Sequence, residues 1–77
     1  MPYELPDRLQ KARCRKMMKA NGLAEESFVP ERLITAFEEG SEEPKAGALY
    51  LLCRALGCSA DYLLGLDKNW KRGNGAG

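Results

Sequence analysis

β-Branched residues, which favour strands, are almost absent from this 77-residue chain. They occur only as Val29, Ile34 and Thr35, whereas Ala, Leu, Met, Glu, Lys and Arg, which favour helices, dominate the first 66 positions. A chain of this length forms at most one domain and buries only about 60% of the surface that it exposes when unfolded. We therefore predict an all-α domain with a small core, and we exclude a nucleotide-binding sheet or a barrel.

Proline, glycine and serine residues mark the ends of five predicted helices. The expected ranges are Pro6-Asp7 to about Met17, Met18 or Lys19 to Ser27, Pro30 to a cap at Gly40, Lys45 to Leu56 before Gly57, and an N-cap at Ser59 to Leu64 before Gly65. Apolar residues recur at a spacing of three to four, which gives each helix an inward face. The inward residues include Leu9, Ala12, Met18, Leu23, Ala24, Leu33, Ile34, Phe37, Leu49, Leu52, Cys53 and Leu56. The basic residues of the first helix should point mostly outward, and these are Arg8, Lys11, Arg15 and Lys16.

The chain divides into an expected domain over residues 1–66 and a basic, glycine-rich tail over residues 67–77, which we expect to be mobile beyond Trp70. No apolar run approaches the roughly 20 residues that span a bilayer, so we expect no membrane partner. The N-terminus has no apolar export segment and the number of cysteines is odd. Both features predict a cytoplasmic, reducing setting.

The three cysteines, Cys14, Cys53 and Cys58, do not form a metal-binding pattern. They contain no C-x-x-C pair, and the chain has no histidine to complete a zinc site. A cysteine nucleophile would also lack a base, and the apolar context of Cys53 and Cys58 is typical of small core residues. We therefore expect no metal, no cofactor and no enzymatic activity.

The net charge of +1 conceals three blocks of charge. Residues 1–20 carry six basic and two acidic side chains, residues 21–44 carry one basic and seven acidic, and residues 45–77 carry five basic and two acidic. The central block therefore has a net charge of −6 between two positive blocks. The total charge predicts no partner, but its distribution bears on which partner the surface can bind.

The order of residues from Asp7 to Gly65 resembles the lambda-repressor-like, or Xre, helix-turn-helix family. Ala24, Val29 and Ile34 stand where the family has the small and apolar residues that lock its second and third helices together. The next segment that matches reads Phe37-Glu38-Glu39-Gly40-Ser41-Glu42-Glu43-Pro44. The last reads Ala55-Leu56-Gly57-Cys58-Ser59-Ala60-Asp61-Tyr62-Leu63-Leu64-Gly65, which is similar to the last two helices of the family. The resemblance implies a five-helix lambda-repressor-like DNA-binding domain.

Two departures from the family lie in the second helix and the turn after it. Phe28 stands where the family usually has glycine, and Gly22 lies inside the second helix. A non-glycine residue at positive φ costs roughly 1 kcal/mol or more, so Phe28 is expected to reshape the turn. The resemblance also pairs Arg13 with Glu38 as a partly buried, bidentate ion pair that orients the third helix. The alternative for these two residues is a pair of solvated surface charges.

The resemblance further implies that the third helix lies in the major groove of double-stranded DNA. Residue by residue, the DNA-binding positions are Lys19, Ala20, Pro30, Glu31, Arg32, Thr35 and Ala36. Arg32 suits bidentate recognition of guanine, Glu31 can accept a hydrogen bond from a cytosine amino group, and Lys19 lies where a phosphate contact is expected. The alternative for Glu31 and Arg32 is an ordinary exposed pair on a solvated helix.

Two functional hypotheses follow. The first is a phage- or prophage-type transcriptional regulator that binds operator DNA as a homodimer, with Tyr62, Leu66 and Trp70 as the expected dimer surface. The alternative for the aromatic residue after the last helix is to cap the core of its own chain. The second is a helix-turn-helix fold that binds another regulatory protein, as an antirepressor or a DNA-mimicking accessory protein, through its acidic centre. Residues 38–43 carry four carboxylates, which oppose DNA binding. We favour DNA binding because most chains with this pattern are regulators.

Overall fold

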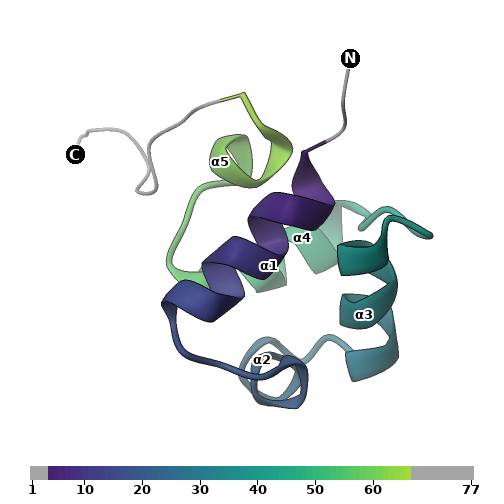
Figure 1. Ribbon diagram of the computed structural model, residues 1–77, viewed down its shortest axis with the longest axis vertical. Coiled ribbons are helices and arrows are strands. Elements are labelled where there is room, and N and C mark those ends of the chain that lie inside the picture. Colours follow the sequence, from purple (N-terminus) through teal and green to yellow (C-terminus); the bar gives the residue numbers. More distant parts are fainter. Residues whose placement is uncertain (1–3, 67–77) are drawn as a thin grey trace.

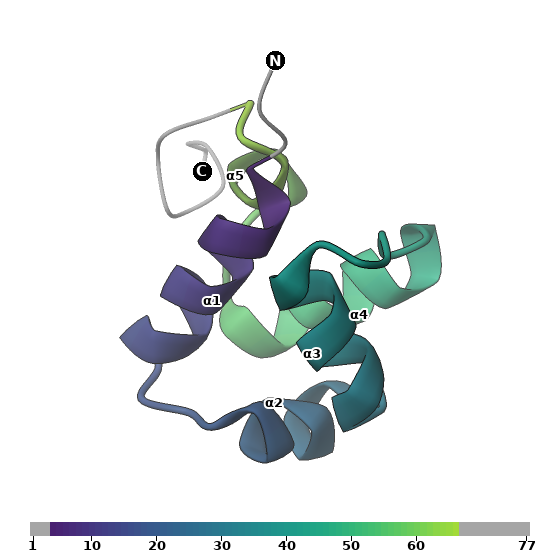
Figure 2. The same cartoon turned by 45° about the vertical axis from the view of Figure 1, so that its right-hand side comes forward.

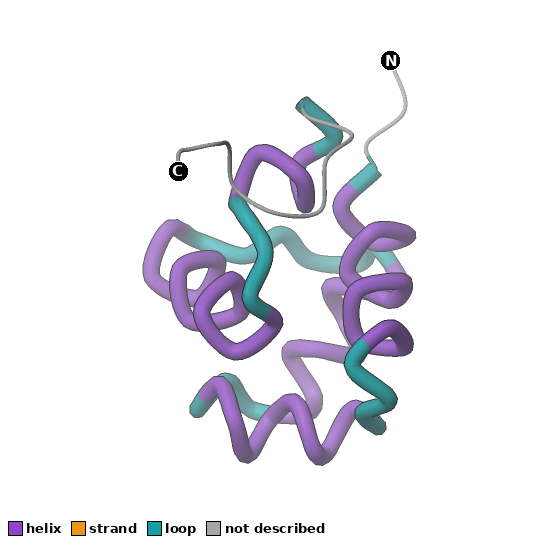
Figure 3. The backbone as a smooth tube through the Cα atoms, turned by 90° about the vertical axis from the view of Figure 1, so that its left-hand side faces the viewer, coloured by secondary structure: helices purple, strands orange, loops and turns teal. Residues whose placement is uncertain are grey.

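A computed structural model describes residues 4–66, and five helices lie in this range. They are α1 (Leu5–Arg15), α2 (Ala20–Ser27), α3 (Glu31–Glu39), α4 (Ala46–Leu56) and α5 (Ala60–Leu64). The described part of the chain contains no strand, so the all-α prediction is confirmed (Figure 3), and each helix end lies within two residues of its expected position. The predicted tail, residues 67–77 with Trp70, lies outside the described residues.

The helices pack in a way that leaves α3 at one edge of the molecule. α1 packs against α3 and α5, α2 packs against α3 and α4, and α4 packs against α5. Figure 1 shows α1 crossing the centre, α2 below it, α3 on the right and α4 behind. Figure 2 shows that the beginning of α3 lies next to α2, whereas its end leads into the loop towards α4. No helix within residues 4–66 combines the length and the apolar character needed to cross a membrane.

All five helices contribute side chains to one core. The buried apolar residues are Leu5, Leu9, Ala12, Leu23, Val29, Ile34, Phe37, Leu52, Leu56, Cys58, Tyr62 and Leu63. Several predicted inward residues are only half-buried and pack on the rim of this core, namely Met18, Ala24, Leu33, Leu49 and Cys53. Because the burial of apolar area is the main force that stabilises a small domain, the inner face of α3, with Ile34 and Phe37, is fixed by the core and its outer face is not.

Three of the helix C-terminal ends follow the capping residues in the sequence, and those of α1 and α2 do not. The Ser59 hydroxyl accepts a hydrogen bond from the Tyr62 N–H at 3.0 Å, which confirms Ser59 as the N-cap of α5. α3, α4 and α5 end at glycines with left-handed backbone, as predicted. α1 instead ends at Arg15, and the chain turns two residues later at Met17, which has a φ of 57° and is 92% exposed. The Met17 and Met18 N–H groups close this end on the carbonyls of Cys14 and Arg13.

Two predictions about side-chain direction at the top of the molecule are wrong. The Arg8 side chain does not point outward, because its Nε donates to Glu4 Oε1 at 2.8 Å and its Nη1 donates to the Tyr62 carbonyl at 3.2 Å. Its guanidinium also lies 4.8 Å from the centre of the Tyr62 ring. Tyr62 is only 9% exposed, so this ring covers the protein's own core and is not available to a second copy. Leu66, which was predicted with it, is 74% exposed.

Candidate nucleic-acid interface

The turn between α2 and α3 keeps a left-handed residue although no glycine is present. Phe28 has a φ of 65° and a ψ of 20°, and its N–H donates to the Ala24 carbonyl at 2.9 Å. Its ring is 84% exposed. Phe28 therefore takes the conformation that favours glycine, and the predicted reshaping of the turn does not occur.

A buried serine, which the sequence analysis missed, fixes the same turn. Ser27 is 2% exposed, and its hydroxyl accepts a hydrogen bond from the Val29 N–H at 3.2 Å. Val29 is 3% exposed and belongs to the same core as Ile34, with Ala24 packed at its edge. The sequence signal for this turn was a serine two residues before an apolar residue, because a serine hydroxyl can accept a hydrogen bond from the backbone N–H two residues later. This bond helps to set the angle at which α3 leaves α2.

The outer face of α3 forms a ridge of exposed side chains, which we call the α3 ridge and define as Pro30, Glu31, Arg32, Thr35 and Ala36. The first four are exposed and Ala36 is half-buried. The Pro30 carbonyl starts the helix by accepting from the Leu33 and Ile34 N–H groups at 3.0 and 3.1 Å. Within residues 4–66, neither an ion pair nor a side-chain hydrogen bond engages Glu31 or Arg32. Both groups therefore remain available to a partner.

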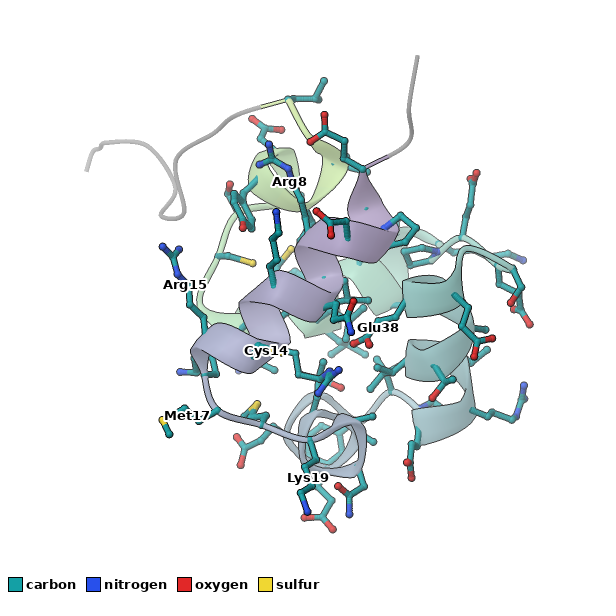
Figure 4. All side chains as sticks on the ribbon, in the orientation of Figure 1. Arg8, Cys14, Arg15, Met17, Lys19 and Glu38 are labelled. Carbon is teal, nitrogen blue, oxygen red and sulfur yellow. The ribbon has the colours of Figure 1, made fainter. Side chains whose placement is uncertain are left out.

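The beginning of α2 lies at the same end of the molecule as the beginning of α3. Lys19 is exposed, Ala20 is half-buried, and Figure 4 shows the Lys19 side chain beside α2 at the bottom of the view. The Lys19 backbone is extended, with a φ of −85° and a ψ of 167°, and its side chain makes no capping hydrogen bond in the described structure. The first N–H groups of α2 thus have no side-chain cap, and such groups can bind an anion.

Arg13 and Glu38 form a two-pronged ion pair between α1 and α3. Arg13 Nε donates to Glu38 Oε2 at 2.7 Å, and Nη2 donates to Oε1 at 3.0 Å. The side chains are only 15% and 12% exposed, and Arg13 Nη1 also donates to the Met18 carbonyl at 2.9 Å. The hydrogen bonds that Arg13 donates to Glu38 raise the pKa of Arg13, and burial opposes this effect. One guanidinium therefore ties the end of α3 to the segment between α1 and α2.

This pair changes the charge at the end of α3 and in the loop that follows it. Glu38 faces Arg13, so three carboxylates remain exposed there, on Glu39, Glu42 and Glu43. Glu39 is the last residue of α3 and the other two follow it, whereas Lys19 lies at the end of the molecule where α3 begins. Figure 4 shows Arg15 on the side of α1 that faces away from α3, so the structure does not bring this basic residue to the ridge. Among the described residues, no group of three or more His, Cys, Asp or Glu side chains is arranged to hold a metal ion.

Comparison with known proteins identifies the family. A family described as helix-turn-helix matches residues 9–63. A crystal structure of the P22 c2 repressor protein in complex with synthetic operator 9T is similar, with 29% identity and a TM-score of 0.79 over 86% of this chain and 100% of that chain. A nuclear magnetic resonance structure of the DNA-binding domain of the P22 c2 repressor has 28% identity and a TM-score of 0.77 over 90% of this chain and 95% of that chain. No curated protein sequence matches.

The family match covers more than half of the chain, and the similar structures share its order of helices. The turn at Phe28 and the ridge on α3 lie inside the matched residues. The chain therefore belongs to the helix-turn-helix family and has the lambda-repressor-like fold.

Proposed function

We propose that this chain is a sequence-specific, DNA-binding transcriptional regulator of the Xre type, which works in the cytoplasm and reads operator DNA with α3. The observation that carries the proposal is the α3 ridge, because it presents an exposed Arg32 that has no partner within residues 4–66, in a fold similar to that of an operator-bound repressor. A guanidinium carries donors in a fixed fork that matches the O6 and N7 acceptors of guanine.

Four residues of the ridge have a chemical role in this proposal. Arg32 reads guanine, Glu31 accepts from a cytosine amino group, and Thr35 offers a hydroxyl and a methyl group to a base edge. Ala36 is small enough to let the helix approach the groove. Lys19 and the uncapped N–H groups at Ala20 bind phosphate, which fixes the position of α2 on the backbone.

We also propose that the protein binds its operator as a homodimer. One short helix reads few base pairs, and two copies would reach half-sites about 34 Å apart along the duplex. The end of α5 offers exposed apolar side chains for this contact, since Leu66 is 74% exposed and Leu64 is 37% exposed. A duplex with two half-sites should therefore bind more tightly than a duplex with one, and changing the spacing by half a helical turn should remove this gain.

The first experiment is a salt titration of binding to random duplex DNA, followed by fluorescence anisotropy. A DNA-binding protein releases counterions from the phosphates, so the logarithm of the affinity should fall linearly with the logarithm of the salt concentration. Absence of binding at about 50 mM salt would refute the proposal. Selection of tight binders from a random duplex library then identifies the preferred sequence.

The second experiment compares Arg32→Ala with Arg54→Ala on that preferred sequence. Losing a bidentate base contact costs about 1–3 kcal/mol, so Arg32→Ala should weaken specific binding by about 5- to 150-fold and relax the preference at one base pair. Arg54 is an exposed arginine of α4, and its guanidinium lies 5.8 Å from the centre of the Tyr50 ring. Its removal changes the net charge equally but should leave the base preference unchanged.

The exposed carboxylates of Glu39, Glu42 and Glu43 favour a second candidate function, which is binding to a basic surface of another regulatory protein. Under this alternative, Arg32→Ala leaves the function intact and charge reversal at Glu42 and Glu43 abolishes it. If Arg32→Ala removes the function and the reversals increase affinity for DNA, the second candidate is excluded.

A further inference from the structure

Cys53 and Cys58 meet at the C-terminal end of α4. The left-handed Gly57 reverses the chain there, and both the Gly57 and Cys58 N–H groups donate to the Cys53 carbonyl, at 2.8 and 3.2 Å. These bonds hold Cys58 next to the last turn of the helix, five residues after Cys53. The two thiols are within hydrogen-bonding range of each other, and no disulfide joins them in this structure.

A small molecule can reach this pair from outside. A hollow of about 300 Å³ is lined by Tyr50, Cys53, Arg54, Gly57 and Cys58. Cys53 is half-buried in its wall and Cys58 is 7% exposed. The exposed Arg54 adds a positive charge at the same opening, which attracts molecules that carry carboxylates.

We propose that Cys53 and Cys58 are a redox-active pair, which an anionic low-molecular-weight disulfide of the glutathione class oxidises to a disulfide within the chain. The site is the hollow at the end of α4, and the proposal does not depend on DNA binding by α3. The product joins the last turn of α4 covalently to the segment that leads into α5.

The reaction proceeds by two exchange steps. Cys53, the more accessible thiol, loses its proton and attacks one sulfur of the small disulfide, so that a mixed disulfide forms and one small thiol leaves with a proton. Cys58 then attacks Cys53 Sγ and expels the second small thiol, which takes the proton of Cys58. Two protein thiols are oxidised, one small disulfide is reduced to two thiols, and the protons and electrons balance.

The environment of Cys58 fits the order of these steps. The hydrogen bond with Cys53 raises the pKa of Cys58, and burial raises it further, so Cys58 keeps its proton at neutral pH. When Cys53 has become a mixed disulfide, it no longer holds a thiol hydrogen bond or a charge against Cys58. The main cause of the raised pKa is then removed, and Cys58 becomes easier to ionise only when its attack is required.

The test uses the full chain with Cys14→Ser, because Cys14 is an exposed thiol on α1 that would react independently. The protein is incubated with oxidised glutathione under native conditions, the reaction is quenched with acid, and the mass of the product is measured by mass spectrometry. The expected product is a monomer that has lost two hydrogens and carries no glutathione. A stable glutathione adduct, or a disulfide between two chains, as the main product would overturn the proposal.

Two further variants test the assigned roles. In the background of Cys14→Ser, Cys58→Ser should stop the reaction at a glutathione adduct on Cys53, whereas Cys53→Ser should slow adduct formation because only the more buried thiol remains. Equal rates of adduct formation in the two variants would contradict the assigned order.

A comparison with the unfolded chain separates the effect of the fold from that of short sequence spacing. The equilibrium constant for forming the disulfide against glutathione is measured in native buffer and in urea. Because the fold holds the thiols together, the native value should be larger by about tenfold, which corresponds to about 30 mV in reduction potential. An equal or smaller equilibrium constant in native buffer would show that the fold does not hold the two thiols in a position that favours the disulfide.

Discussion

At the scale of single residues, Met17 and Phe28 take a conformation that costs free energy without obvious benefit to the core. Both have positive φ, at 57° and 65°, and their side chains are 92% and 84% exposed. For a residue with a Cβ atom, left-handed backbone costs roughly 1–2 kcal/mol. The two residues flank α2, where the chain must turn sharply before and after the helix. The requirement of the turns therefore outweighs the local preference of the side chains.

We predict that Phe28→Gly stabilises the protein by about 0.5–1 kcal/mol, because it removes the left-handed strain and loses little packing of a ring that is 84% exposed. Urea denaturation measures the change. Phe28→Ala is the matched control, since it removes the same ring but keeps the Cβ atom in left-handed backbone. If Phe28→Ala stabilises the protein as much as Phe28→Gly, exposure of the ring and not backbone strain is the cause.

Arg13 and Glu38 give a second prediction at this scale. Arg13→Ala leaves the Glu38 carboxylate only 12% exposed and without its two donors, which should destabilise the protein by about 2–3 kcal/mol in urea denaturation. Adding Glu38→Gln should recover part of this loss, because the unpaired charge disappears. As a control, Lys11→Ala breaks an ion pair with Asp7 whose side chains are 68% and 66% exposed, and should cost less than about 0.5 kcal/mol. Similar losses for Arg13→Ala and Lys11→Ala would contradict this account.

At the scale of helices, α2 is the element that the sequence supports least. It has only eight residues, its first turn has no side-chain cap, and it contains Gly22. Glycine in a helix is less favourable than alanine by about 1 kcal/mol. The helix forms nevertheless, because Leu23 and Ser27 are buried and α2 packs against both α3 and α4. Tertiary packing thus determines the position of the helix that precedes the α3 ridge.

We therefore predict that Gly22→Ala stabilises the protein by up to about 1 kcal/mol in thermal or urea denaturation. A Cβ atom added at Gly22 would meet only Met18 Cβ, at 4.0 Å, so it fits without a clash. The contrasting variant is Gly65→Ala, where φ is 85° and the new Cβ atom would lie 3.1 Å from Glu4 Cβ. This second change should destabilise the protein, and a gain in stability there would contradict the role assigned to left-handed backbone.

The helix ends were predictable because proline, glycine and serine act through local geometry. Gly40, Gly57, Gly65 and Ser59 were each identified from their immediate neighbours in sequence. The direction of Arg8 was not predictable in this way, because one of its acceptors is the Tyr62 carbonyl, 54 residues further along the chain. The left-handed Met17 carries no sequence signal either. The family resemblance paired Arg13 with Glu38, but only the structure gives the third bond, from Arg13 to Met18.

At the scale of the whole molecule, the charges on the side of α3 are unevenly distributed. Lys19 lies at the same end of the molecule as the beginning of α3, whereas the exposed carboxylates lie at the other end of this helix, on its last residue, Glu39, and on Glu42 and Glu43 after it. For a ridge that enters a groove, phosphates would flank both ends of the helix. One end is then suited to phosphate and the other repels it. In the proposed complex with operator DNA, base contacts by Arg32 must therefore supply more of the affinity than they would in a protein with a uniformly basic surface.

The acidic end gives the prediction that tests this balance. If Glu42 and Glu43 face phosphate, Glu42→Lys with Glu43→Lys should increase affinity for random duplex DNA, because each lysine can release a condensed counterion. The slope of the logarithm of the affinity against the logarithm of the salt concentration should become steeper by up to about 1.8, because each of the two new phosphate contacts adds about 0.9 to the slope. The preference for the selected sequence over random DNA should fall, because the binding free energy gained from the new phosphate contacts does not depend on the base sequence. As a control, Glu25→Lys with Glu26→Lys makes the same change of charge on exposed residues of α2, before the turn. If the control pair raises the slope as much as the loop pair, net charge and not the position of the loop governs binding, and the proposed placement of this loop beside the DNA backbone is wrong.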